Sequence, residues 1–201
     1  KLQWKKPSGR KASLDTNVVT TSTHDTELQN FKVISDNIAA EGSILFGPDN
    51  KIKEFDFPDL NLNVISKLDI DGTRSKDDVW AINISGSNYD GRSFFKSLFS
   101  VGDGPGRTGK QAANATRVSV NLGNVIGSSD VSLRNLKMQA ETRNGNLVSL
   151  DARGTLDGGA PLVAALDQST GSRRLIVTST DAGQVLKLVN FYPNMQGGRL
   201  R

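Results

Sequence analysis

The feature that most constrains the fold is a succession of short strand-like segments separated by turn residues along almost the whole chain. The clearest junction is Asn144-Gly145, which stands between two segments of mixed polar and apolar residues, 130–142 and 146–156. Asn-Gly is a strong signal for a two-residue hairpin, because both turn positions need a positive φ. We therefore expect two adjacent antiparallel strands here.

Other segments repeat apolar residues with the two-residue period of a strand that buries one face. In the segment 79–87, for example, Trp80, Ile82 and Ile84 fall on one face and polar or small residues fall on the other. Val and Thr, which favour strands, are frequent in several of these segments. The expected strands are 12–24, 28–35, 42–46, 52–57, 61–71, 79–87, 116–122, 130–142, 146–156, 161–167 and 173–179.

The composition fits a sheet with one buried face and one solvated face. Hydrophobic residues make up 36% of the chain and glycine contributes 20 residues. These values indicate many turns and less buried surface than a sheet covered on both faces needs. The prediction is a mostly β fold, an antiparallel meander that forms a curved open sheet or groove, with two short amphipathic helices.

The two helices are expected where the strand pattern is interrupted. The first spans 91–100 with Asp90 as its cap, and the second spans 182–191 with Thr180 or Asp181 as its cap. Each carries its apolar residues on one helical face. These faces consist of Phe94, Phe95, Leu98 and Phe99 in the first helix, and Val185, Leu186 and Val189 in the second.

The distribution of charge indicates which kinds of partner the chain is expected to bind. The net charge is +4, and basic residues gather at the start of the chain, between Lys1 and Lys11. This segment suits contact with an anionic membrane surface, but a solvated end or linker is the favoured interpretation. No aromatic stacking motif alternates with the basic residues, so nucleic acid is not an expected partner.

The chain contains no cysteine, which excludes disulfides, thiolate nucleophiles and cysteine metal sites. No run approaches the ~18 apolar residues of a membrane span. The chain begins at Lys1, and its last residues, Gly-Gly-Arg-Leu-Arg, are typical of a strand that is just starting. We expect a single β-rich fragment, 1–201, of a larger protein, and any sub-boundary would fall in the polar loop 102–115.

Two loop patterns are similar to ligand-binding motifs but lack essential parts. Residues 104–110 have the GxxxxGK spacing of a phosphate-binding loop, yet Gln111 stands where the magnesium-binding Ser or Thr belongs. Residues 69–72, Asp-Ile-Asp-Gly, lack the third early ligand and the final Glu of a calcium loop. A flexible loop and a hairpin are the expected structures.

Catalytic groups are equally sparse. His24 is the only histidine, and its polar Thr- and Ser-rich surroundings favour an exposed strand residue over a catalytic base. Glu54, Asp56 and Asp59 could supply a carboxylate pair for glycoside hydrolysis, but sugar clefts also need several Trp or Tyr residues. We therefore predict no enzymatic activity, no cofactor and no metal site.

The end of the chain carries the one family signal. Residues 179–183 read Ser-Thr-Asp-Ala-Gly, and they precede a short helix with paired leucines, Tyr192, and then Gly197-Gly198. This pattern resembles the AsmA-like superfamily of Gram-negative envelope proteins (the YhdP and TamB type). The resemblance is closest over 146–201 and is only compositional over 1–145.

The resemblance implies a periplasmic segment whose parent is anchored in the inner membrane. Its function would be non-enzymatic: an apolar β-groove, contacting phospholipid acyl chains and the remainder of the parent chain, that carries phospholipid between the inner and outer membranes. The alternative is a structural or interaction β-domain of an envelope protein with no lipid path. The candidate lipid-facing or core residues are Trp80, Ile82, Ile84, Phe94, Phe95, Leu98, Phe99, Val118, Val120, Val148, Leu150, Leu175, Val177, Val185, Leu186 and Val189.

Overall fold

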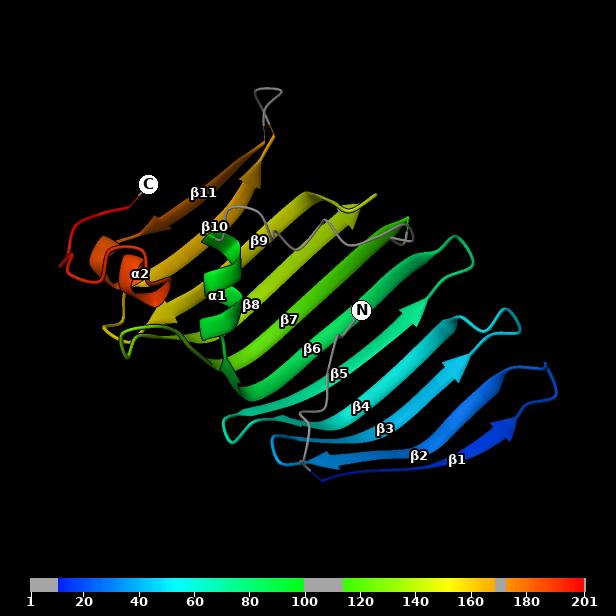
Figure 1. Cartoon of the computed structure of the whole chain (residues 1–201). Helices are drawn as coiled ribbons and strands as arrows, with labels where there is room; N and C mark the ends of the chain where they lie inside the picture. Colours follow the sequence, from blue (N-terminus) through cyan, green and yellow to red (C-terminus); the bar gives the residue numbers. More distant parts are fainter. Residues whose placement is uncertain (1–10, 100–113, 169–172, 201) are drawn as a thin grey trace.

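A computed structural model describes residues 11–99, 114–168 and 173–200. They form one sheet of eleven strands whose order in the sheet is their order in the sequence (Figure 1). The mostly β, open-sheet prediction is confirmed. The strands are β1 (Ala12–Thr20), β2 (Thr26–Ser35), β3 (Ile38–Phe46), β4 (Ile52–Leu62), β5 (Ser66–Arg74), β6 (Val79–Asp90), β7 (Ala115–Ile126), β8 (Ser132–Arg143), β9 (Asn146–Leu156), β10 (Pro161–Asp167) and β11 (Arg174–Ser179).

One neighbouring pair departs from the expected meander. β6 and β7 run parallel, from the pair Val79↔Ala115 to the pair Asp90↔Ile126, whereas every other neighbouring pair is antiparallel. A parallel pair cannot be joined by a tight hairpin and needs a crossover connection. Helix α1 (Arg92–Phe99) lies in this connection.

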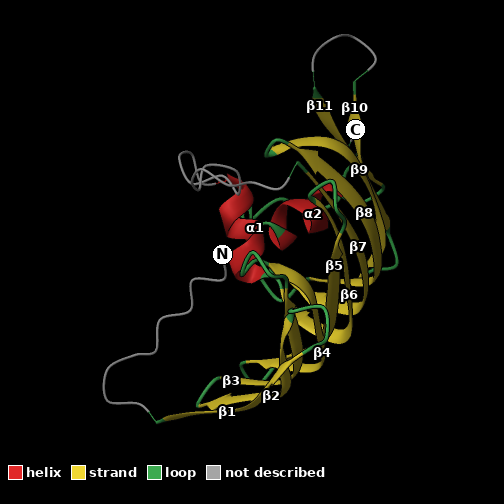
Figure 2. Ribbon diagram, turned by 90° about the vertical axis from the view of Figure 1, so that its right-hand side faces the viewer, coloured by secondary structure: helices red, strands yellow, loops and turns green. Residues whose placement is uncertain are grey.

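The sheet is strongly curved, and its two helices lie on its concave side (Figure 2). Helix α2 (Ala182–Leu188) follows β11, so each helix comes directly after a strand. The described part of the sheet curls without closing, so β1 and β11 are its two edge strands.

Turn chemistry explains where the strands meet. Asn144 and Gly145 have φ values of 50° and 76°, as the two-residue hairpin requires, and β9 and β10 have the expected bounds. Two expected strands were too long. β1 ends at Thr20 because His24 adopts a φ of 62° in a turn, and the segment 61–71 contains a turn at Asn63, whose φ is 58°.

The helices also differ from their expected bounds. Helix α2 ends at Leu188 instead of 191, and Asp181, not Thr180, is its cap: the Asp181 side chain accepts a hydrogen bond of 3.0 Å from the backbone N–H of Gln184. The loop 102–113, its GxxxxGK motif and the basic residues 1–10 lie outside the described residues.

Candidate functional site

The concave side of the sheet carries one continuous apolar surface, which we call the apolar face. Residues directly paired on neighbouring strands point to the same side of a sheet, so the register traces this face from strand to strand. For example, Leu60 pairs with Leu68, and Ile70 pairs with Ile84, which in turn pairs with Val120. The apolar face consists of Leu14, Val18, Leu28, Phe31, Val33, Ile38, Ile44, Phe55, Phe57, Leu60, Leu62, Leu68, Ile70, Trp80, Ile82, Ile84, Val118, Val120, Leu122, Leu136, Met138, Leu150, Leu162, Leu175 and Val177.

One end of the apolar face is a packed core. Leu122 and Leu162 are buried there beside Leu156, and the same cluster includes Phe95 of α1 and Leu188 of α2. Leu156 and Leu188 are each only 1% exposed. The two helices therefore cover this end of the face, and the residues beneath them serve stability.

Helix α2 is held by hydrogen bonds as well as by its apolar side chains. The backbone N–H of Ser128 donates to the Leu188 carbonyl at 3.0 Å, and the N–H of Gly158 donates to Oε1 of Gln184 at 3.3 Å. A β-carbon at Gly127 would lie 2.5 Å from Leu188 Cδ1, so only glycine lets the helix approach this closely. The helix is thereby fixed on the turns at one end of the sheet.

Helix α1 is fixed at its start. The N–H of Asp90 donates to the Ser66 hydroxyl at 3.0 Å, and Ser66 is 1% exposed. Nε and Nη2 of Arg92 donate to the two oxygens of the Asp90 carboxylate at 2.8 and 2.6 Å. The hydrogen bond from Arg92 holds the pKa of Asp90 below its usual value, and this charged pair joins the first residue of the helix to the end of β6.

Four aromatic rings occupy the apolar face between β2 and β6. Phe31 and Phe57 lie 5.7 Å apart between ring centroids, and Phe55 lies 6.2 Å from Phe57 and 5.6 Å from Trp80. The rings pack over glycines of the intervening strands: a β-carbon at Gly72 would clash with the Phe55 ring. A similar clash at Gly42 would involve both Phe57 and the backbone of β4. These four rings form a half-buried aromatic row, which extends the apolar face beyond the helices.

Away from the helices the apolar face becomes open to solvent. On β1 the side chains of Leu14 and Val18 are 64% and 65% exposed, and on β11 Leu175 is 58% exposed. Isolated exposed apolar residues are ordinary, but these stand at the two ends of one continuous apolar surface. That arrangement, more than any single residue, marks the face as a candidate binding surface.

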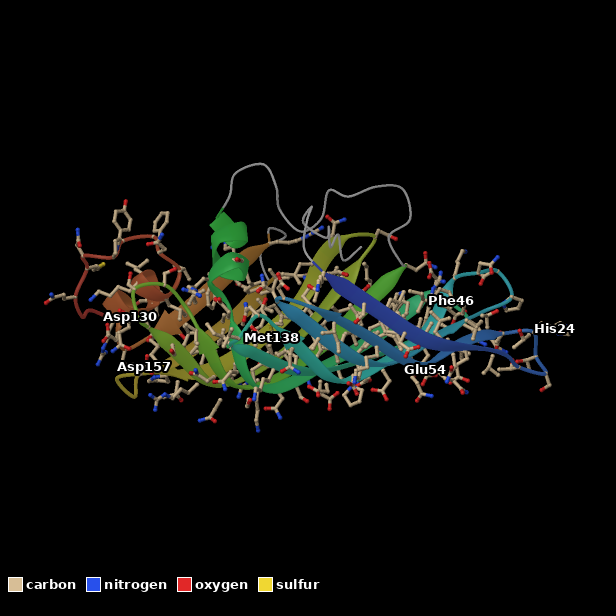
Figure 3. The ribbon with its side chains drawn as sticks, turned by 60° about the horizontal axis from the view of Figure 1, so that its bottom comes forward. His24, Phe46, Glu54, Asp130, Met138 and Asp157 are labelled. Atoms are coloured by element: carbon tan, nitrogen blue, oxygen red, sulfur yellow. The ribbon has the colours of Figure 1, made fainter. Side chains whose placement is uncertain are left out.

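The convex side of the sheet is mostly polar. Glu141 of β8 forms ion pairs with Arg143 at 2.6 Å and with Arg117 of β7 at 3.4 Å, and the Arg143 hydrogen bond lowers the pKa of Glu141. Glu54, which projects from the sheet in Figure 3, is exposed on this side. Asp56 and Asp59, the other carboxylates considered for glycoside hydrolysis, pair in register with convex-side residues and are likewise exposed.

The other groups considered for chemistry lie in a hairpin and in a turn of the sheet. Asp71 accepts a hydrogen bond of 2.8 Å from the Asn83 side chain, so the segment 69–72 is part of the hairpin of β5 and β6. His24 is exposed in the β1–β2 turn at the end of the sheet (Figure 3), not in a strand. The described residues contain no group of three or more His, Cys, Asp or Glu side chains that could hold a metal ion.

Most of the sequence-predicted apolar residues lie on or under the apolar face. The register places eight there: Trp80, Ile82, Ile84, Val118, Val120, Leu150, Leu175 and Val177. Val148 instead stands where the register between β8 and β9 shifts.

The apolar faces predicted for the two helices differ from the residues that the helices bury. In α1, Phe95 is 8% exposed, but Phe94 is 42% exposed, and the side chains of Leu98 and Phe99 lie outside the described set. In α2, Val185 is buried, whereas Leu186 and Val189 are only half-buried. The deepest residue of that helix is Leu188, which the predicted stripe omits.

Sequence reasoning missed the part of the face on β2 to β5. In β4 the register shifts between Phe57 and Leu60, so apolar residues change from odd to even positions along one strand. A strict two-residue period breaks there. The shift coincides with Pro58, and a search for alternation restarted at each such residue would have found Leu60 and Leu62.

Comparison of the chain with family models, with curated proteins and with solved structures finds no match. Among the described residues no helix is long and apolar enough to cross a membrane.

Proposed function

We propose that this chain is a non-enzymatic, periplasmic segment of an AsmA-like envelope protein, and that its apolar face shields phospholipid acyl chains as they pass between membranes. The observation that supports this function best is the continuity of the apolar face across all eleven strands, opposite a mostly polar convex side. A sheet built only to form a core would not need an apolar surface that continues past its helices. The resemblance at 179–198 supports the choice of an acyl chain as the occupant.

The mechanism is passive. Each acyl CH₂ that leaves water for an apolar surface contributes about 0.8 kcal/mol, so a chain of ordinary length is held without specific polar contacts. The half-buried row from Phe31 to Trp80 offers such a surface, and no ionisable group has to change its charge. Binding of this kind favours movement along the face over tight fixation at one point.

The two sides of the sheet provide a matched test. A photo-cross-linking amino acid at Phe57 or Ile82 stands on the apolar face, and one at Asp56 or Asn83, the neighbouring residues, stands on the convex side. With the protein produced in a Gram-negative periplasm, we expect phospholipid adducts from the first pair and few from the second. Equal labelling from both sides, or none, would contradict the proposal.

Native mass spectrometry of the purified protein distinguishes the alternative function. Co-purified phospholipid that is lost in an Ile82→Asp variant, but kept in Asn83→Asp, would support the lipid surface. Both variants must first show wild-type circular dichroism. Protein that is consistently free of lipid would favour a structural or interaction domain, in which the helix-covered end of the face acts only as a core.

A further inference from the structure

We propose that the outer edge of β1 is a docking surface for a second copy of this chain, and that the two β1 strands pair antiparallel about a two-fold axis at Thr16. In the described part of the chain β1 pairs with β2 alone, so one side of its backbone has no strand beside it. Such a row of N–H and C=O groups is a ready template for another strand. This inference is independent of lipid binding.

The edge lacks the features that usually prevent strand addition. β1 contains no proline, and Asp15 is its only charged residue. Its register with β2 shifts between Asp15 and Asn17, but the extra residue belongs to β2, where Asn30 adopts a φ of 50°. β1 itself therefore keeps a regular alternation over its nine residues.

The opposite edge of the sheet is partly covered. Leu200 and Ser179 exchange two backbone hydrogen bonds, with N···O distances of 3.0 and 3.2 Å, so the chain after α2 lies against the end of β11. β11 also begins at Arg174, next to Arg173, and both are exposed. The two edges thus differ: among the described residues nothing pairs with the outer side of β1, which lies at one end of the sheet (Figure 1) and carries a single charged residue.

The sequence of β1 is complementary to itself in one register. With Thr16 on the axis, Leu14 of each copy faces Val18 of the other, and Asp15 faces Asn17. All nine residues then pair. Moving the axis to Asp15 would place two carboxylates directly opposite each other, which is unfavourable.

The two-fold axis stands perpendicular to the sheet, so the apolar faces of both copies lie on the same side. The exposed Leu14 and Val18 side chains, at 64% and 65%, would cover one another across the junction. The result is a closed dimer, which an isologous contact of this kind produces.

Cysteine substitution tests the surface and the register together, because the natural chain has no cysteine. In the proposed register position 16 faces itself, at a Cβ separation of about 4.5–5.5 Å that a disulfide can nearly span. We expect Thr16→Cys to give a disulfide-linked dimer under mild oxidation. Ser13→Cys, whose position faces Val19 of the other copy, should remain largely uncross-linked.

Sedimentation equilibrium provides the second measurement. The wild-type protein should dimerise with increasing concentration, and Leu14→Lys combined with Val18→Lys should weaken dimerisation at least about tenfold, because like charges then face each other. Leu175→Lys, on the opposite edge, should leave it unchanged. A wild-type protein that stays monomeric, equal cross-linking of both cysteine variants, or a dimer lost only in Leu175→Lys would overturn the proposal, whatever the lipid experiments show.

Discussion

The replacement Leu188→Ala tests how helix α2 is attached to the sheet. Leu188 is 1% exposed and lies over Gly127, so truncation removes buried carbon atoms from a site whose backbone is fixed by hydrogen bonds. Buried Leu→Ala changes cost about 2–5 kcal/mol, and we expect about 3 kcal/mol here. For a chain of this length that loss lowers the melting temperature by about 6–12 °C.

The matched control is Leu186→Ala, which truncates the same side chain two positions earlier. Leu186 is half-buried, so about 1 kcal/mol is expected. Thermal and urea unfolding followed by circular dichroism would measure both changes, with the unfolding slope in urea checked for constancy. If Leu186→Ala destabilised the protein as much as Leu188→Ala, the helix would bury a different face and the attachment described above would be wrong.

Three further changes test other contacts. Gly42→Ala should lower the unfolding free energy by about 1–3 kcal/mol, because the new methyl group meets the backbone of β4, while Ser43→Ala should change it little; urea unfolding compares them. Asp181→Ala removes the cap of α2 and should cost about 0.5–2 kcal/mol, measured in the same way; no loss would mean that the cap is dispensable. Lys53 donates to Asp25 at 2.8 Å and lowers the pKa of Asp25 below its ordinary 3.8 in the folded state, so this stabilisation is present above that pH and is lost as the pH falls through the lowered pKa. Lys53→Met should therefore flatten the acid limb of a plot of melting temperature against pH, and an unchanged limb would contradict the assignment.

Local patterns were sufficient to predict the strands and one face of several of them. Alternation in β6 placed Trp80, Ile82 and Ile84 together, and the Asn-Gly turn located the hairpin of β8 and β9. Both signals depend on residues within a few positions of each other.

Longer-range features could not be predicted in the same way. The parallel pairing of β6 with β7 depends on how the connection containing α1 crosses the sheet, which no local period records. The burial of Leu188 is determined by Gly127, a residue in a distant turn. The apolar face of β4 could not be found by a two-residue period, because after Phe57 the register shifts and the inward-facing residues change from odd to even positions.

The apolar face combines two roles that usually occur on separate surfaces. Beneath the helices its side chains are as buried as any core, with Leu122 at 4% exposure, yet on β1 the same face leaves Leu14 and Val18 mostly in water. Exposed apolar area carries a cost of about 25 cal/mol per Å², so a continuous uncovered surface favours an occupant. The two proposals assign different parts of that surface to different occupants. Acyl chains would cover the aromatic row between β2 and β6, and a second copy would cover the β1 edge. If both hold, removing the second copy should expose the edge without displacing lipid from the row that contains Phe57, because the two occupants contact different strands.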